Sequence, residues 1–182
     1  MRDIQKCPDS IALDDTSLAQ LKGRGYVLKP QLSAHMNNGV LYVDDKKVSL
    51  SDSLCWQITH ISSNDTLVEM AMRFYFPNLK SVSFPNATTI RQNAFLGCTA
   101  LTSASFPNAT NIERAAFYKC TTLTSASFPN ATYIGDYAFW DCTALTSISF
   151  PNVTNIGTNA FSYCTALTSV SFPNATDIGD LA

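Results

Sequence analysis

The sequence predicts an α+β fold in which a solenoid of 22-residue units follows a small cap at the amino end. Three observations predict it. One pattern of 22 residues recurs through the last two thirds of the 182-residue chain. The apolar residues of each unit alternate as in a strand and then follow helical offsets, so we expect a strand and a short helix per unit. The first 57 residues lack the pattern.

The repeat carries the strongest signal. Four complete units begin at Ile90, Ile112, Ile134 and Ile156, and thirteen of their 22 positions are identical in all four. A fixed period indicates a solenoid, because each unit covers the apolar side chains of its neighbour. A weaker copy, a half-match and a final stub extend the pattern to residues 68–89, 58–61 and 178–182.

The spacing within one unit predicts its local structure. Ile148 and Phe150 fall on one face at period two, as in a strand, and Pro151 ends that strand because it lacks a backbone donor. After Ile156, the apolar residues follow at offsets of four, five and eight, which predicts one inward-packing helical turn. These residues are Ala160, Phe161 and Cys164.

The amino-terminal part is expected to be an α+β cap over residues 1–57, with the solenoid in 58–182. A solenoid needs its first rung covered. A separate partner-binding role for the cap is the alternative. The expected elements are a short helix capped near Asp15 and ending at Gly23, a strand at 26–28, a turn at 37–39, and a hairpin of 40–43 with 46–50.

The repeat resembles a known family. The motif I-G-x-x-A-F-x-x-C-T-x-L-T-S-[AIV]-S-F-P-N, over residues 68–182, resembles the BspA-like, or Treponema-type, leucine-rich repeats. The chain departs from that motif at Phe76, which replaces the cysteine, and at the truncated final unit. The resemblance implies a leucine-rich-repeat solenoid and a role in adhesion or protein recognition.

The cysteines indicate a compartment. Four of the six recur at one repeat position and no CxxC pair exists, so they are expected to be free, buried thiols rather than disulfides or metal ligands. Residues 1–15 contain no apolar stretch typical of a secretory signal. We therefore expect a cytoplasmic protein of a bacterium or a phage-infected cell. If Met1 is only an expression start on a trimmed secreted protein, the cell surface is the alternative.

Composition and motifs argue against several classes of function. A net charge of −2 opposes a broad basic nucleic-acid face, and no apolar run reaches the ~18 residues of a membrane span. His35 and His60 lack metal-ligand spacing, and the serine and threonine rows lack an adjacent base. We therefore expect no enzyme, metal or cofactor. The repeated Asn-x-Thr triplets are interpreted as turn chemistry.

Positions that vary between units are the candidate contact residues. Aromatic residues gather there, and tyrosine and tryptophan are enriched at binding hot spots. Sequence drift at solvent positions is the alternative explanation. The candidate partner-binding residues are Tyr118, Lys119, Tyr133, Tyr137, Trp140, Asp141 and Tyr163.

The last unit predicts a second kind of contact. Its apolar residues are expected to form an uncovered edge, which indicates a homodimer through the carboxyl end or a chain that continues. The residues of this expected dimer edge are Leu167, Val170, Phe172 and Ile178.

These observations favour a non-catalytic protein-binding module, with an intracellular inhibitor as the main hypothesis. In length and repeat appearance the chain is similar to a type II anti-CRISPR protein. That resemblance implies steric or allosteric blocking of a type II RNA-guided CRISPR effector nuclease. The alternatives are a fragment of a bacterial cell-surface adhesin that binds host proteins, and a purely structural assembly element.

Overall fold

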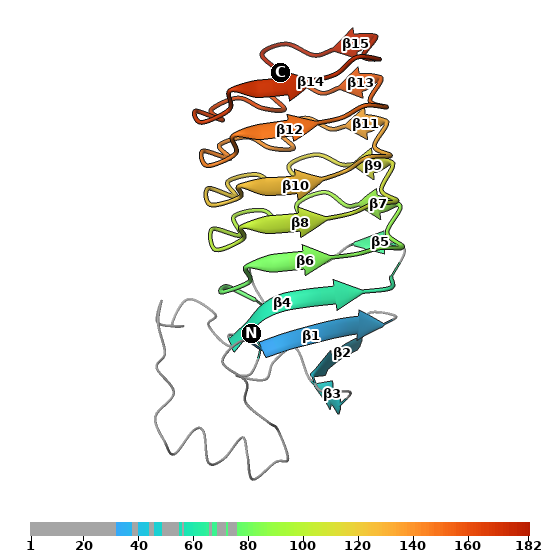
Figure 1. Cartoon of the computed structure of the whole chain (residues 1–182), viewed down its shortest axis with the longest axis vertical. Helices are drawn as coiled ribbons and strands as arrows, with labels where there is room; N and C mark the ends of the chain where they lie inside the picture. The colour runs from blue at the N-terminus through green and yellow to red at the C-terminus, as the bar shows by residue number, and fades with distance from the viewer. Residues whose placement is uncertain are drawn as a thin grey trace.

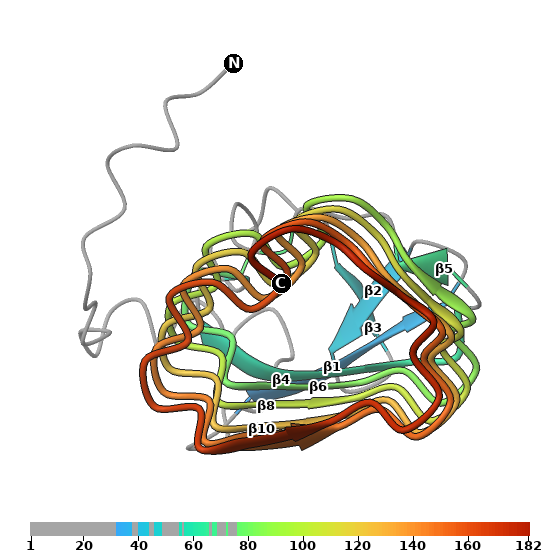
Figure 2. The same cartoon turned by 90° about the horizontal axis from the view of Figure 1, so that it is seen from above.

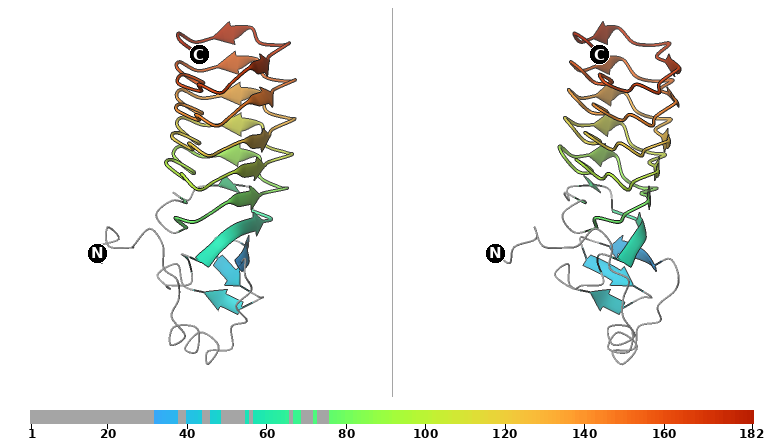
Figure 3. Two further views of the ribbon diagram at one scale, coloured as in Figure 1. Left: turned by 60° about the vertical axis from the view of Figure 1, so that its left-hand side comes forward. Right: turned by 90° about the vertical axis from the view of Figure 1, so that its left-hand side faces the viewer.

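The repeat units form the rungs of a parallel β-solenoid. The computed structural model describes residues 32–37, 40–43, 46–48, 55, 57–65, 67–68, 72 and 76–182. Successive rungs lie one above the other along a single axis (Figure 1, Figure 3). Seen down that axis, the rungs superpose (Figure 2). The predicted solenoid is therefore confirmed.

The first wall of the solenoid is built from the predicted strand of each unit. The serine-flanked strands pair in parallel with no shift, so that Ala104 lies between Val82 and Ala126. Inward and outward residues alternate, as period two requires. The wall consists of β4 (Ile58–Ser63), β6 (Ser81–Ser83), β8 (Ser103–Ser105), β10 (Ser125–Ser127), β12 (Ser147–Ser149) and β14 (Ser169–Ser171).

A second wall comes from strands that the sequence pattern did not predict. Each has only two residues and ends at the inward residue that opens a unit, so that Ile90, Ile112 and Ile134 form one column. Two residues are too few to show alternation. These strands are β5 (Leu67–Val68), β7 (Thr89–Ile90), β9 (Asn111–Ile112), β11 (Tyr133–Ile134), β13 (Asn155–Ile156) and β15 (Asp177–Ile178).

The expected helical turn of each unit is wrong. From Phe76 to Ala182 the chain contains strands and turns and no helix. Backbone donors alternate between a bond within the turn and a bond to the next rung. The N–H of Cys120 donates to Phe117 at 3.1 Å, whereas the N–H of Phe117 donates to Ala138 at 2.8 Å. Bonding between rungs uses the donors that a helix needs for its own i−4 carbonyls.

The amino-terminal strands extend the first wall. β1 (Leu32–Asn37) pairs in parallel with β4, and β2 (Val40–Val43) and β3 (Lys46–Val48) follow as antiparallel neighbours. The predicted hairpin is confirmed, and β1 was not predicted. The helix near residues 15–23 and the strand at 26–28 lie outside the described residues. An α+β cap is therefore not confirmed, because its described residues within 32–48 form strands only.

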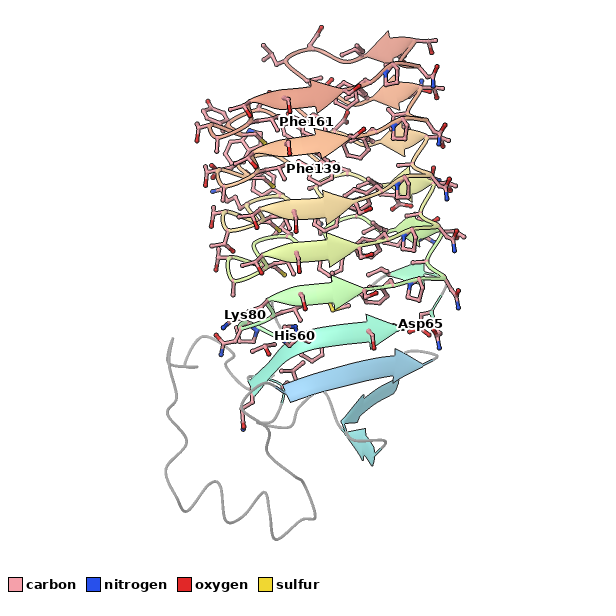
Figure 4. The ribbon with its side chains drawn as sticks, viewed as in Figure 1. His60, Asp65, Lys80, Phe139 and Phe161 are labelled. Atoms are coloured by element: carbon pink, nitrogen blue, oxygen red, sulfur yellow. The ribbon has the colours of Figure 1, made fainter. Side chains whose placement is uncertain are left out.

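The core consists of identical side chains stacked along the axis. Rings in two phenylalanine columns stack at centroid distances from 5.0 to 5.8 Å, and rings of different columns meet edge-on or tilted. Phe139 and Phe161 belong to one such column, on successive rungs (Figure 4). Stacked aromatic pairs contribute about 0.5–1.5 kcal/mol beyond their area.

Polar side chains form ladders on the outside. The amide of Asn108 donates to the Pro85 carbonyl at 2.7 Å, and the amide of Asn130 donates to the Pro107 carbonyl at the same distance. The hydroxyl of Thr132 donates to the Thr110 carbonyl at 3.2 Å. The repeated Asn-x-Thr triplets thus have a structural role in the turns.

Candidate functional site

Four equivalent turns make up one side of the solenoid, and we call this side the turn face. It consists of residues 91–97, 113–119, 135–141 and 157–163, each following an inward isoleucine. Most of the positions that differ between units lie here, whereas the first wall repeats the same serines. Most residues of the predicted contact set therefore belong to one face of the molecule.

Each turn of this face holds two residues in the left-handed backbone region. That conformation costs a residue with a side chain roughly 1–2 kcal/mol, and glycine avoids the cost. Only Gly97 is a glycine at these positions. The third-offset residues are Asn93, Ala115, Tyr137 and Asn159, and the seventh-offset residues are Gly97, Lys119, Asp141 and Tyr163.

Three aromatic rings of the turn face form what we call the aromatic ladder: Tyr118, Trp140 and Tyr163. Tyr118 and Trp140 stack with centroids 4.6 Å apart and planes 6° apart. Tyr163 meets the Trp140 ring edge-on at 5.0 Å and is 66% exposed. The Nζ of Lys119 lies 5.7 and 5.4 Å from the centroids of the first two rings. Aromatic surface and positive charge thus lie together.

The remaining predicted contact residues lie in three different places relative to the ladder. Asp141 follows Trp140 in the chain, and its carboxylate has no hydrogen bond or ion pair within the described part of the chain. Tyr137 lies under the guanidinium of Arg114, at 5.4 Å from centroid to Cζ. Tyr133 belongs to β11 in the second wall. The structure therefore does not bring Tyr133 to the turn face.

Sequence reasoning missed the left-handed backbone of these turns. A signal was present, because asparagine and glycine are the residues that most often adopt this conformation. Asn93, Asn159 and Gly97 occupy these positions in two of the units. The interpretation of these segments as helical turns left this signal unused.

The expected dimer edge lies on the last rung. Val170 and Ile178 are 42% and 60% exposed, whereas Leu167 and Phe172 are partly buried against the core. Leu181 is also exposed. A dimer through this edge stays a prediction.

The repeated cysteines form a buried column. Cys120 and Cys142 donate their thiol protons to the carbonyls of Phe95 and Phe117, each at 3.2 Å. Burial raises the pKa of the Cys120 thiol, and nearby Cys98 adds to the rise. Thiolates are the form that binds metals and attacks electrophiles, so a neutral buried thiol behaves as a small apolar group.

The first rung contains the histidine that the sequence analysis noted. His60 on β4 is half-buried, and its Nδ1 hydrogen-bonds to the hydroxyl of Ser81. The Nε2 atom is buried without a hydrogen-bond partner among the described residues. Asp65 lies at the other end of β4 (Figure 4) and does not orient this imidazole. The described residues thus contain a serine–histidine pair here without the third group that an activated serine uses.

Two further searches cover the described residues only. They contain no group of three or more histidine, cysteine, aspartate or glutamate side chains placed to hold a metal ion. No helix among them has the length and apolar character needed to cross a bilayer.

Three solved structures are similar to this chain. A leucine rich repeat protein of T. pallidum is 30% identical, with a TM-score of 0.51 over 54% of this chain and 51% of its own. A leucine rich cell surface protein of Faecalibacterium prausnitzii is 22% identical, with a TM-score of 0.50 over 83% and 44%. A leucine-rich repeat protein of Bacteroides ovatus is 26% identical, with a TM-score of 0.49 over 68% and 31%. This chain thus covers about half of those proteins or less.

The family comparison covers most of the chain. No curated protein matches this chain. The family model described as BspA type Leucine rich repeat region matches six copies over residues 55–182. Leucine-rich repeat proteins typically serve as protein-binding modules, and nothing in these matches indicates an enzyme. The chain belongs to the BspA type leucine rich repeat family.

Proposed function

We propose that this protein is a non-catalytic binding module that contacts a protein partner through its turn face. The observation that carries the proposal is the aromatic ladder beside Lys119 and Asp141. Two of its members, Trp140 and Tyr118, are large rings that are only half-buried. Large aromatic side chains next to charged groups are the usual composition of a binding hot spot.

The backbone conformation of the turns also supports the turn face as the contact surface. Lys119, Asp141 and Tyr163 occupy the left-handed position where the first unit has Gly97. Three units therefore have a strained, non-glycine residue at a position where glycine would adopt the same backbone without strain. Strained residues of this kind concentrate at functional sites. Selection of these side chains for what they contact explains the choice better than selection for folding.

Two classes of partner follow from the sequence hypotheses. An adhesin would bind host proteins at the cell surface, and an inhibitor would block a type II RNA-guided nuclease inside the cell. The nuclease hypothesis has no support from particular residues and stays a prediction, as does a cytoplasmic location. The turn face is available to either class.

The test compares two variants of the purified chain. The ladder is removed in the triple variant Tyr118→Ala/Trp140→Ala/Tyr163→Ala. The first wall is altered at the same number of positions in the control variant Ser103→Ala/Ser125→Ala/Ser147→Ala. Binding to immobilised host matrix proteins and inhibition of DNA cleavage by a guide-loaded type II nuclease are measured for both. We expect binding to be lost only in the first variant.

Other outcomes separate the hypotheses. Near-stoichiometric inhibition of cleavage that needs the ladder would support the nuclease inhibitor, and saturable matrix binding that needs the ladder would support the adhesin. Binding that is lost in the serine variant and kept in the ladder variant would overturn the turn face as the contact surface. Far-UV circular dichroism checks that both variants fold.

A further inference from the structure

The charges of the turn face reverse sign between two adjacent rungs. Lys119 and Asp141 occupy the same offset on the rungs that begin at Ile112 and Ile134. Arg114 and Asp136 occupy another shared offset on the same two rungs. Two equivalent positions therefore change from basic to acidic at the same step.

The described charges reverse along the rest of the solenoid as well. Residues 77–119 contain four basic residues and one acidic residue, which gives +3. Residues 120–182 contain four acidic residues and no basic one, which gives −4. The step between the rungs of Lys119 and Asp141 is thus also the point at which the charge of residues 77–182 changes sign.

From this arrangement we propose that the turn face binds a second copy of this chain, side by side and antiparallel. The inference rests on the proposed function, because it names the partner of the same surface. A twofold axis across the face, between the two rungs, reverses the order of rungs and keeps each offset in place. An interface of this kind must be self-complementary.

The twofold operation places complementary groups opposite each other. Lys119 faces Asp141 of the second copy, and Arg114 faces Asp136 of the second copy. Tyr118 faces the second copy's Trp140, so the aromatic ladder lies at the centre with charge pairs on both sides. The basic half of one rod then lies along the acidic half of the other, and such complementarity fixes register and orientation.

The side chains of these residues are compatible with an outside partner. The Lys119 ammonium lies over two rings and forms no ion pair in the described structure, and the Asp141 carboxylate has no ion pair there either. Arg114 is exposed, and its guanidinium lies over the Tyr137 ring. Asp136 uses one carboxylate oxygen to accept from the N–H of Thr158 at 2.9 Å, which leaves the other available.

A charge-reversal exchange tests the proposal. Lys119→Asp makes both facing positions acidic, and Asp141→Lys makes both basic. Each substitution introduces a residue that the neighbouring rung already has at that offset, so the turn geometry is preserved. We expect sedimentation equilibrium to show twice the 19.8 kDa chain mass for wild type. Each single variant should dissociate with a dissociation constant raised on the order of a hundredfold.

Recombination of the variants gives the decisive readout. An equimolar mixture of Lys119→Asp and Asp141→Lys restores complementary pairs and should recover the double mass as a mixed dimer. The double variant Lys119→Asp/Asp141→Lys should recover it alone. Tyr133→Ala, outside the turn face, should leave the wild-type mass unchanged.

Three results would overturn the second copy as partner. The first is a wild-type chain that stays monomeric at its highest soluble concentration. The second is a single variant that dimerises as the wild type does. The third is an equimolar mixture of the two single variants that remains monomeric. A dimer that ignores both reversals but is lost in Ile178→Glu would assign the contact to the carboxyl end instead. The proposed function fails separately, through the ladder variant's unchanged binding to other proteins.

Discussion

The interior and the turn face of this solenoid are built from the same units but follow opposite rules. Inside, every complete unit has the same phenylalanines, the same cysteine and the same leucine, because each side chain packs on its own copy. On the turn face, equivalent positions hold lysine, aspartate and tyrosine, even where the backbone favours glycine. Repetition therefore indicates packing, and the positions that vary against the backbone preference are those at which we propose that a partner binds.

The largest expected effect is in the interior. Phe117 is fully buried between Phe95 and Phe139, with centroid distances of 5.0 and 5.2 Å. Phe117→Ala should lower the free energy of unfolding by about 3–5 kcal/mol, as measured in urea. Its sequence neighbour on the turn face provides the contrast, since Tyr118→Ala should cost about 1 kcal/mol. Equal losses at the two positions would contradict the distinction between interior and face.

A smaller loss should follow where a glycine lets two rungs approach each other closely. A Cβ added to buried Gly135 would lie 2.6 Å from the backbone nitrogen of Arg114 and 2.8 Å from the carbonyl carbon of Glu113. Gly135→Ala should therefore destabilise the chain by about 1–3 kcal/mol in thermal or urea unfolding. Glu113→Ala, at the equivalent position of the rung below, is the control. It loses the exposed pair with Arg91 and the hydrogen bond that its carboxylate accepts from the N–H of Gln92 at 3.0 Å, and it should cost about 1 kcal/mol.

The cysteine column predicts a dependence on pH. Burial raises the pKa of the Cys120 thiol in the folded state. Cys142 and Cys164 form a hydrogen bond that raises the thiol pKa of the first and lowers that of the second, so their contributions oppose each other and the prediction is made for Cys120. Because the unfolded thiols ionise first, above about pH 8.5, stability is complete below that pH. It then falls by about 1.4 kcal/mol per pH unit for the Cys120 thiol.

Urea unfolding between pH 8 and 9.5 measures this slope. Cys120→Ala should flatten it by the share of one thiol. An unchanged slope in this variant would show that the Cys120 thiol ionises equally well in the folded chain. That result would argue against a sealed interior.

The smallest expected effect is a gain in stability on the turn face. Asp141 has a φ of 60°, so Asp141→Gly relieves strain but adds freedom to the unfolded chain. Because the relieved strain is the larger of the two effects, the substitution should stabilise the chain by about 0.5–1 kcal/mol. Self-association should weaken, because the proposed pair with Lys119 of the second copy is lost. Ser147→Gly, in a strand of the first wall, should destabilise it by about 0.5–1 kcal/mol instead. A loss of stability in Asp141→Gly would show that the aspartate was selected for folding.

Sequence periodicity predicted the first wall, but neither the second wall nor the backbone of the turns. The strand that contains Ile148 was predictable because its alternation is visible within one unit. The segment from Ile156 to Cys164 has inward residues at helical offsets, yet its donors bond to the next rung. Local spacing cannot distinguish these two arrangements, because the competing hydrogen-bond acceptors lie 22 residues away in the chain.

The candidate site was predictable in its residue types and not in its geometry. Variation between units identified Tyr118, Lys119, Trp140, Asp141 and Tyr163, which the structure places on one face. The same reasoning also selected a tyrosine of β11, which the structure places in the second wall. Variation identifies positions that face solvent, and only the path of the chain shows which of them are neighbours.

The sequence by itself determined the solenoid, its 22-residue period and its column of like side chains, because identical units can bury their apolar faces only on one another. Only the tertiary structure decided that each turn has two residues in the left-handed region instead of a helical turn, and that three aromatic rings form a ladder. Both depend on contacts between rungs. Such contacts exist only after residues far apart in the chain have been stacked at the spacing of a β-sheet.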